Sequence, residues 1–543
     1  MLLNGAQILM ECLKEQQVDT IFGYPGGTIL NVYDELYKHT DIHHILTAHE
    51  QGAAHAADGY ARSTGKVGVC FATSGPGATN LTTGIATAYM DSIPMVAITG
   101  QVPSHLLGRD IFQEVDITGA VTPFTKHTYL VKDAAQLPRI IKEAFYIAST
   151  GRPGPVLIDI PSDVQEQTVQ DVSFPEQVII RGYNPSVRGN DKQISNVADA
   201  ISRASRPVIC AGGGVFLADA KEDLLTFARQ TGIPVVTTMM GLSLLETEDP
   251  LYMGMIGAHG NACANRALAK SDLLIMIGTR AADRAIIAPD EIEKRMPSIH
   301  IDVDPAEIGK NMRATVPLVG NVKVILHQLM ERAITVSCEE WCQMLHRQRQ
   351  EELQRKFPSR PGSIFPGRLF RLLGQKLDKD AAVCVDVGQN QLWACKHLVL
   401  RGGRLLTSGG LGTMGYSLGA AIGVKTAQPQ RQTVVICGDG SFQMSMNELA
   451  AIQCAVMDVK IVLMRNNTLG MVHEIQKRAP YRGPYGVSLD GSPAFETIAA
   501  AYGIPSITVN NEDTLDEQLD RFLRTEGCCL LICEVHPDMS TTD

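Results

Sequence analysis

Two stretches near the C-terminus decide the fold: Thr433-Val-Val-Ile-Cys-Gly-Asp-Gly-Ser441 and Ile461-Val-Leu-Met-Arg-Asn-Asn-Thr468. Each begins with an apolar run typical of a buried parallel strand and ends in polar residues where such a strand should stop. The segment between them, from Met446 to Val456, has helical composition. The order strand, Gly-Asp-Gly turn, helix, strand and Asn-Asn therefore predicts a parallel α/β sheet.

The carboxyl ends of these two strands form the first candidate binding site. Parallel sheets bind ligands in the crevice outside those ends, which here would hold the carboxylate of Asp439 and the amide oxygen of Asn466. Oxygen ligands of low total charge suit Mg²⁺, which usually completes its octahedron with phosphate oxygens and water. The glycines let the backbone approach a phosphate, and the following helix offers its N-terminal N–H groups. Since a Gly-Asp-Gly alone is more often an ordinary turn, the flanking strands and the Asn pair carry this prediction.

Length and composition indicate a multidomain globular chain. The 543 residues suggest three or four domains, and 45% hydrophobic with 20% charged residues is typical of a soluble protein. A net charge of −10 gives no reason to expect nucleic-acid or anionic-membrane binding. No apolar run approaches membrane-spanning length and no secretory leader opens the sequence, so we expect a cytoplasmic protein.

Thirteen cysteines are scattered through the chain, and none forms a Cys-x-x-Cys pair. Cys338 and Cys342 are four residues apart, but no neighbouring cysteine or histidine pair completes a zinc site. We therefore expect reduced, mostly buried thiols.

Strand-like and helix-like segments alternate along the whole chain. They predict three successive α/β domains with parallel sheets flanked by helices, at residues 1–170, 191–335 and 362–543. Between them, residues 171–190 are polar with two prolines and predict a linker. Residues 336–360 are charged and helix-prone, and we interpret them as a surface helix followed by a linker.

Glycine-rich turns and a single acid mark further candidate sites. Glu50 opens an alanine-rich segment that predicts a helix, where an acid is favoured by the helix dipole whether or not it has a further role. In the central block, strands end in Gly212-Gly-Gly214, in Gly278-Thr-Arg280 and in Asp302. Strands that end in this way resemble nucleotide-binding architecture, but no Gly-x-Gly-x-x-Gly is present and ordinary turns explain them equally well.

Taken together, these features resemble the acetohydroxyacid (acetolactate) synthase family, thiamine diphosphate (ThDP) enzymes, and in particular its FAD-binding catalytic subunits. The resemblance covers nearly the whole chain, and no single motif is specific. The motifs that carry it are Phe22–Gly27, His49–Ala54, Ala72–Asn80, Phe112–Val115, Thr125–His127, Gly151–Pro155, His300–Gly309, Asp386–Gln389, Gly410–Gly415 and Leu469–Val472.

The resemblance implies a role for each residue at a matching position. Glu50 is implied to activate ThDP, while Asp439, Asn466 and the carbonyl of Thr468 are implied to hold Mg²⁺. The substrate end is implied to include Gln113, Lys126 and Arg284. Further positions implied to bind ThDP are Pro25, Gly26, Thr73, Gly77, Asn80, Val387, Gly388, Gln389, Asn390, Gly412, Met414, Gly438, Gly440, Ser441, Gly470 and Met471. FAD, structural rather than redox-active in this family, is implied at Arg152, Gly212, Gly213, Gly214, His259, Arg280, Asp283 and Asp302.

The implied reaction is the decarboxylation of pyruvate and transfer of the two-carbon unit to a second 2-keto acid. The product is 2-acetolactate or 2-aceto-2-hydroxybutyrate, in the first common step of branched-chain amino acid biosynthesis. The resemblance also implies a homodimer or tetramer, with each active site between two subunits, and a regulatory small subunit as partner.

Other functions are also compatible with the sequence. A different ThDP-dependent 2-keto acid decarboxylase or acetyltransferase would share the fold, as would a non-catalytic paralogue. A nicotinamide-dependent dehydrogenase is disfavoured, because the required glycine fingerprint is missing.

Several positions depart from the family pattern. Ile475 stands where the family commonly has a tryptophan that favours 2-ketobutyrate, which predicts a weaker preference for that acceptor. The other departures are Ser162, Ala258, the Ala281-Ala-Asp-Arg284 stretch, Asn390 and the short segment after Pro537. They bear on substrate choice, FAD affinity and closure of the site, while the residues implied for ThDP and metal are intact.

Overall fold

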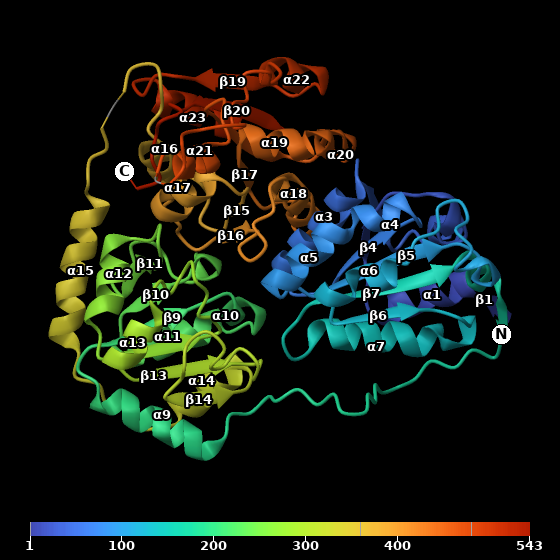
Figure 1. Cartoon of the computed structure of the whole chain (residues 1–543), viewed down its shortest axis with the longest axis horizontal. Helices are drawn as coiled ribbons and strands as arrows, with labels where there is room; N and C mark the ends of the chain where they lie inside the picture. The colour runs from blue at the N-terminus through green and yellow to red at the C-terminus, as the bar shows by residue number, and fades with distance from the viewer. Residues whose placement is uncertain (1, 359, 479, 543) are drawn as a thin grey trace.

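The computed structural model describes residues 2–358, 360–478 and 480–542. Three six-stranded parallel sheets, each flanked by helices, follow one another along the chain (Figure 1). The predicted fold class, three successive α/β units, is therefore confirmed. Among the described residues, no helix combines the length and the apolar character needed to cross a membrane.

The N-terminal sheet has its most apolar strands in the middle, where helices cover both faces. From edge to edge its strands are β3 (His43–Leu46), β2 (Thr20–Gly23), β4 (Gly68–Ala72), β5 (Met95–Gln101), β7 (Pro155–Pro161) and β6 (His127–Leu130). Beside it, β1 (Leu2–Asn4) pairs antiparallel with β8 (Thr168–Gln170). The helices are α1 (Gly5–Glu15), η1 (Gly27–Ile29), α2 (Leu30–Lys38), α3 (Glu50–Thr64), α4 (Pro76–Asn80), α5 (Thr82–Asp91), η2 (Ser104–Leu106), α6 (Ile117–Val121), η3 (Thr122–Phe124), η4 (Ala134–Gln136), α7 (Leu137–Ser149) and α8 (Ser162–Glu166).

The central sheet is a second doubly covered layer, joined to the first by the extended segment 171–190 (Figure 1). Its strands run in the order β11 (Tyr252–Met255), β10 (Val235–Thr237), β9 (Pro207–Ala211), β12 (Leu273–Ile277), β13 (Ser298–Asp302) and β14 (Val316–Val319). The helices of this block are α9 (Asp191–Arg203), α10 (Gly214–Leu217), α11 (Lys221–Thr231), η5 (Met239–Gly241), α12 (Ala262–Lys270), α13 (Pro289–Arg295) and α14 (Val322–Met330).

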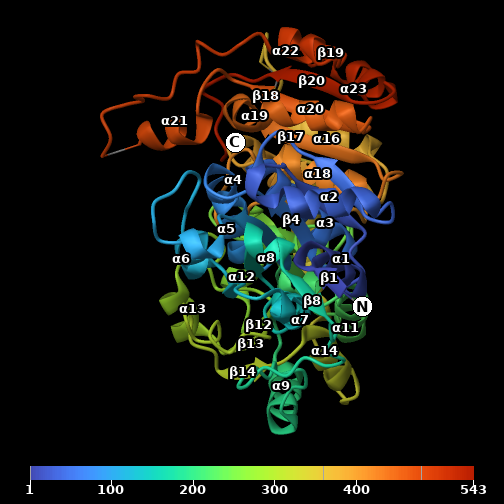
Figure 2. The same ribbon diagram turned by 90° about the vertical axis from the view of Figure 1, so that its right-hand side faces the viewer.

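The C-terminal sheet contains the two apolar runs at 433–437 and 461–464 as neighbouring strands. Its strands run in the order β16 (Arg404–Thr407), β15 (Ala382–Val385), β17 (Thr433–Gly438), β18 (Val459–Arg465), β20 (Cys529–Glu534) and β19 (Ser506–Val509). The helices are α16 (Pro366–Lys376), α17 (Gln389–His397), α18 (Tyr416–Ala427), α19 (Asp439–Ser445), η6 (Met446–Glu448), α20 (Leu449–Cys454), α21 (Gly470–Gln476), α22 (Phe495–Ala501) and α23 (Leu515–Arg524). In the side view, α21 extends away from the body of the protein (Figure 2).

The helix expected from Met446 is present as η6 and α20, but two other expectations need correction. The Gly-Asp-Gly segment, expected as a turn, instead begins a further helix, α19, at Asp439, because Gly438 has an extended backbone and its N–H donates to the hydroxyl of Ser441 in a helix-capping arrangement. The helix α15 (Glu339–Leu353), expected on the surface, instead buries Trp341 and Leu345. The indole of Trp341 donates to the carbonyl of Pro207, so α15 packs on the central block.

The N-terminal and C-terminal blocks meet along α3 and α18, which lie side by side at the centre of Figure 1. Glycines make this approach close: a Cβ at Gly423 would lie 1.9 Å from the carbonyl oxygen of Ala56, and one at Gly59 would lie 2.1 Å from that of Ala420. The Tyr416 hydroxyl also donates to Asp58 at 2.6 Å. At these glycines the backbones of the two helices therefore pack in direct contact.

All thirteen cysteines are free thiols, and eleven of them are buried. The expectation of reduced, mostly buried thiols is confirmed.

Candidate active site

Asp439 and Asn466 meet at the carboxyl ends of the neighbouring strands β17 and β18. Asp439 is 2% exposed and accepts the N–H groups of Asn466 (3.0 Å), Asn467 (2.6 Å) and Gly440 (2.9 Å). Burial raises the pKa of Asp439 to about 6, although these backbone donors lower it. The carboxylate is thus held by backbone donors, and no ion pair joins it to a cationic side chain among the described residues.

Gln389 ties a third element to this pair. Its side-chain oxygen lies 3.3 Å from the Nδ2 of Asn466, and its Nε2 donates to Glu474 at 2.9 Å. A Cβ at Gly470 would lie 2.0 Å from that oxygen and 2.7 Å from the Asn466 nitrogen. Gly470 is therefore required where α17 and α21 converge on Asn466.

Asp386 fixes the two glycine-rich turns of this half of the site. It is fully buried, and it accepts the N–H groups of Val387, Gly415 and Ser417, each at 2.9 Å, together with the Ser417 hydroxyl at 2.6 Å. The turn at 386–390 and the loop at 408–415 are consequently held to one carboxylate. The loop carries Gly412, whose φ of +75° favours glycine and beside which a Cβ would meet open space.

The remaining predicted residues of this half lie around the same strand ends. Met414 Cε would lie 3.5 Å from a Cβ at Gly440. The side chain of Asn390 donates to the Asp386 carbonyl at 2.7 Å, and the Thr468 hydroxyl donates to the Val487 carbonyl at 3.0 Å. Gly388 precedes α17 with φ +144°, Gly438 and Ser441 cap α19, and Met471 lies in α21.

Glu50 forms the core of a second half-site, in the N-terminal block. It opens α3 as predicted, is 8% exposed, and accepts a hydrogen bond from Asn80 at 2.9 Å. A Cβ at Gly77 would lie 3.2 Å from its other carboxylate oxygen, and Gly77 also packs on Thr73. Gly26 packs against the same threonine, directly after the exposed Pro25. The structure therefore brings these predicted ThDP residues together around one acid.

Within the described part of the chain, no hydrogen bond or ion pair joins Glu50 to Asp439 or Asn466. Contacts between the two blocks are made by other residues. Asp91 of α5 accepts the N–H groups of Gly409 (3.1 Å) and Gly410 (2.7 Å) and pairs with Arg62 at 2.9 Å. The N-terminal block thus holds the loop that carries Gly412 from outside the C-terminal sheet.

The residues predicted for the substrate end are separated in the structure. Gln113 has φ +63° and lies against Gly75, so it adjoins the Glu50 half-site. Arg284 is exposed, and its carbonyl accepts the Ala258 N–H beside His259. Lys126 instead donates to the carbonyls of Ile147 and Thr150, and burial lowers the pKa of Lys126 to about 8.

The residues predicted for FAD follow the strands of the central sheet. The turn at Gly212 to Gly214 packs on Gly278, where a Cβ at Gly212 would lie 2.4 Å from the Gly278 carbonyl. Asp302 ends β13, is 8% exposed, and has a pKa that burial raises to about 6. Arg280 and the exposed Asp283 follow β12, and His259 contacts Thr541 at 3.3 Å. Arg152 spans two blocks, since it pairs with Glu307 at 2.6 Å and with Asp304 at 3.3 Å.

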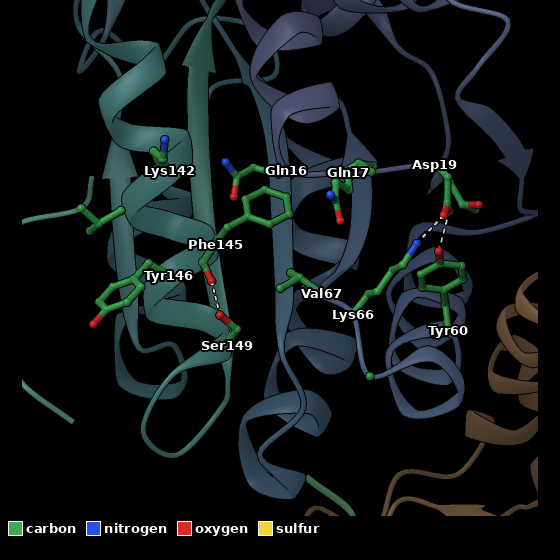
Figure 3. Close-up of a pocket in the computed structure, with 14 residues that line it drawn as sticks. Gln16, Gln17, Asp19, Tyr60, Lys66, Val67, Lys142, Phe145, Tyr146 and Ser149 are labelled. Atoms are coloured by element: carbon green, nitrogen blue, oxygen red, sulfur yellow. Dashed lines mark hydrogen bonds and ion pairs between the residues drawn. The ribbon is translucent and has the colours of Figure 1, made fainter. Parts of the chain in front are cut away.

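A cavity of about 390 Å³ lies at the opposite edge of the N-terminal sheet, at the amino ends of β2 and β4 (Figure 3). Lys66 and Tyr60 both contact Asp19 there. None of the predicted site residues lines it. Since parallel sheets bind ligands at their carboxyl ends, this cavity is not part of the candidate site.

Comparison with known proteins finds three domain models that match successive parts of the chain. Thiamine pyrophosphate enzyme models match at residues 3–120 (N-terminal TPP binding domain), 194–329 (central domain) and 386–533 (C-terminal TPP binding domain). An acetolactate synthase of Arthrospira platensis is 43% identical over 99% of this chain and 95% of its own length. Acetolactate synthase large subunits of Corynebacterium glutamicum (44%, over 94% of this chain and 83% of theirs) and Lactococcus lactis (39%, 95% and 90%) are similar.

The chain belongs to the acetolactate synthase family of thiamine pyrophosphate enzymes. The ThDP-dependent carboligase class predicted from its motifs is therefore confirmed.

Sequence reasoning missed residues that position the site in this acetolactate synthase family member. Asp386 was read as part of a motif, without a role of its own, although it organises two turns. Asp91 and Glu448 were not singled out, although Glu448 accepts the Ala48 N–H at the start of α3. Their signal in the sequence is weak, because an isolated acid in a helical segment is usually an exposed surface residue.

Proposed function

We propose that this chain is the catalytic subunit of an acetolactate synthase, which joins the two-carbon unit of pyruvate to a second 2-keto acid. The observation that carries the proposal is the convergence of Asp439, Asn466 and Gln389 at the carboxyl ends of β17 and β18, in a chain of this family. Bound ThDP supplies an electron sink that makes decarboxylation of a 2-keto acid feasible.

Mg²⁺ fits the donor set around Asp439. Burial disfavours the charge of this carboxylate, so a divalent cation would stabilise its ionised form. Asn466 and the carbonyl of Thr468 supply neutral oxygens. Among the described residues no cluster of three or more His, Cys, Asp or Glu side chains gathers, so the cation would need the diphosphate to complete its shell.

Glu50 is proposed to hold the proton at the ring nitrogen of the cofactor's pyrimidine. Asn80 occupies one carboxylate oxygen, and the other faces Gly77, where the absence of a side chain leaves room. A buried acid with one oxygen engaged and one available is suited to general acid–base work.

FAD is proposed to bind the central block as a structural cofactor. The close-packed glycines at 212–214 and the buried Asp302 at a strand end resemble a dinucleotide site, where an acid receives ribose hydroxyls. Arg280, Asp283 and His259 would complete this site. Gln113, Lys126 and Arg284 are retained as proposed substrate-end residues, and Ile475 on α21 is proposed to weaken selection of 2-ketobutyrate.

We further propose a homodimer or tetramer, in which Glu50 of one chain faces Asp439 of another. Support comes from the two half-sites, which share no hydrogen bond or ion pair within the described chain. The name "large subunit" carried by relatives supports a regulatory small subunit as partner. The proposed domains are pyrimidine-binding (1–170), FAD-binding (191–335) and diphosphate-binding (362–543).

The decisive test is an acetolactate assay on purified protein with pyruvate, ThDP and Mg²⁺, with and without FAD, beside Glu50→Gln. Acetolactate formation that FAD stimulates and that falls at least about 100-fold in the variant is expected, from the usual size of acid–base contributions. Acetaldehyde instead of acetolactate from cofactor-loaded protein would reject the proposal.

Mixing two inactive variants tests the shared site. Glu50→Gln and Asp439→Asn chains, refolded together in equal amounts, should recover up to about a quarter of wild-type activity, because half of randomly formed dimers are mixed and each has one intact site. Activity that stays at the level of the separate variants would place both residues in one chain's own site.

A further inference from the structure

A small basic cavity lies where the central block, the helix α15 and the C-terminal block meet. Its volume is about 60 Å³, and β11, α15, α16 and α17 contribute lining residues, together with Asn261 just before α12. These elements lie at the junction of the central and C-terminal blocks (Figure 1). Four cationic side chains line it: Arg349, Arg355, Arg371 and Lys396. None of the residues assigned above to ThDP, Mg²⁺, FAD or substrate is among its lining residues.

Arg349 is the buried centre of this cluster. The residue is only 4% exposed, and its Nε is buried without a hydrogen-bond partner. Its guanidinium stands 5.9 Å from the ring centre of Tyr252, and one terminal nitrogen lies 3.4 Å from Glu352. A buried guanidinium with an unused donor favours an additional acceptor in the cavity.

Glu352 is the carboxylate among the described lining residues, and the start of α12 already uses it. It accepts the N–H groups of Ala262 (3.1 Å) and Cys263 (3.2 Å) and the side chain of Asn261 (3.3 Å). An acid in this place compensates the positive end of a helix dipole. Among the lining residues it can therefore balance at most one of the three arginines, and it lies beside Arg349.

Burial and the positive charges that line the cavity lower the pKa values of neighbouring groups. Burial and then the charges of Lys396, Arg371, Arg355 and Arg349 lower the pKa of His397 to about 3. Burial, followed by the charge of Arg349, also lowers the pKa of Arg371. Several like charges in one partly buried space are unfavourable unless a counter-charge is present.

We propose that this cavity binds a small inorganic oxyanion such as phosphate, held by Arg349 and Arg371 at the junction of the three blocks. The size limits the ligand, because cavities for cofactors and drug-sized molecules are typically about 300–1,000 Å³. Planar guanidinium groups match the geometry of phosphate oxygens. The site is distinct from the diphosphate site, since Gln389 and Lys396 lie at opposite ends of α17, roughly 10 Å apart along the helix.

Calorimetric titration of inorganic phosphate into the full chain, saturated with ThDP, Mg²⁺ and FAD at constant ionic strength, tests the proposal. Saturation of the cofactors prevents phosphate from reporting on their own sites. Saturable binding is expected in the wild type. Arg349→Met, which keeps an apolar stem, and Arg371→Gln should each weaken the affinity by at least about tenfold, the usual effect of a lost charge-assisted hydrogen bond.

Arg347→Gln is the matched control, because Arg347 is an exposed residue of α15 outside the cavity. It should bind phosphate as the wild type does. No saturable binding to the wild type, or equal affinity in the wild type and Arg371→Gln, would overturn the proposal. Arg371 is only half-buried, so its variant decides the test even if Arg349→Met does not fold.

Discussion

Replacing Glu448 by glutamine should stabilise the protein at alkaline pH and leave its stability nearly unchanged in acid. Glu448 is 1% exposed and belongs to the C-terminal block, but it contacts the start of α3 in the N-terminal block. One carboxylate oxygen accepts the Ala48 N–H at 3.1 Å, and the other is buried without a partner. Burial, with a smaller contribution from the charge of Glu50, raises the pKa of Glu448 to about 7 against the N–H groups that lower it.

The magnitude follows from the shift of this pKa on folding. The ordinary value of 4.5 applies to the unfolded chain, and each pKa unit corresponds to about 1.4 kcal/mol. Because the folded carboxyl binds its proton more tightly, the wild type loses stability as the pH rises from about 4.5 to about 7, by up to about 3 kcal/mol. Above that range the loss is constant. A glutamine resembles the protonated acid in shape and has no proton to lose in this pH range, so the variant carries no such pH-dependent loss.

Urea unfolding of the cofactor-free protein at fixed concentration, at pH 5 and pH 8.5, measures the difference. The variant should exceed the wild type by less than about 1 kcal/mol at pH 5 and by up to about 3 kcal/mol at pH 8.5. Glu331→Gln, at an exposed position that follows α14, is the control for the change in net charge and should show no such dependence. A difference that is the same at both values, or a variant less stable at pH 8.5, would refute the reasoning.

Three further substitutions probe the site itself. Gly470→Ala would place a methyl group 2.0 Å from the Gln389 oxygen. The concentrations of ThDP and Mg²⁺ that give half-maximal activity should therefore rise at least about tenfold. Gly491→Ala, where a Cβ would meet open space, should leave both concentrations unchanged. Asp91→Asn leaves Arg62 without its second carboxylate, so the free energy of unfolding, measured by thermal unfolding, should fall by up to about 3 kcal/mol. Titration with ThDP should also show a weaker affinity. Unchanged ThDP affinity would contradict the role of Asp91 in holding the 408–415 loop. Asp439→Asn removes the charge of the proposed metal ligand, and Mg²⁺ should then no longer raise the unfolding temperature in the presence of ThDP.

The core strands and the helix that Glu50 opens were predictable because their signals are local. Apolar runs such as 433–437 and 461–464 are long enough to identify buried strands, and these two are present as β17 and β18. Edge strands such as β11 and β19 were missed, since they are short and have mixed composition. The short helix α19 was not predicted, because Gly-Asp-Gly has the composition of a turn but the geometry of a helix cap.

The candidate site was predictable only as two separate lists of residues. Asp439 and Asn466 follow neighbouring strands, so chain order alone suggests that they meet. Gln389 and Asn466 are in contact although they are 77 residues apart in the sequence, and no local sequence pattern predicts this contact. Lys126 shows the opposite case: its motif predicts a place at the substrate end, while its ammonium group is hydrogen-bonded to carbonyls around the end of α7.

The glycine-rich loop 408–415 is held in place by residues from a distant part of the chain, in the N-terminal block. A loop rich in glycine, such as 408–415, gains little stability from its own side chains and has many conformations to lose on folding. Asp91 binds two of its N–H groups, and Thr87 meets Thr413 at 2.8 Å. Displacing the loop would leave Asp91 with two fewer donors in a buried position, which is unfavourable. The position of Gly412 is therefore set by the N-terminal block as well as by Asp386, so substitutions in α5 should alter ThDP affinity from more than 300 residues away in the sequence.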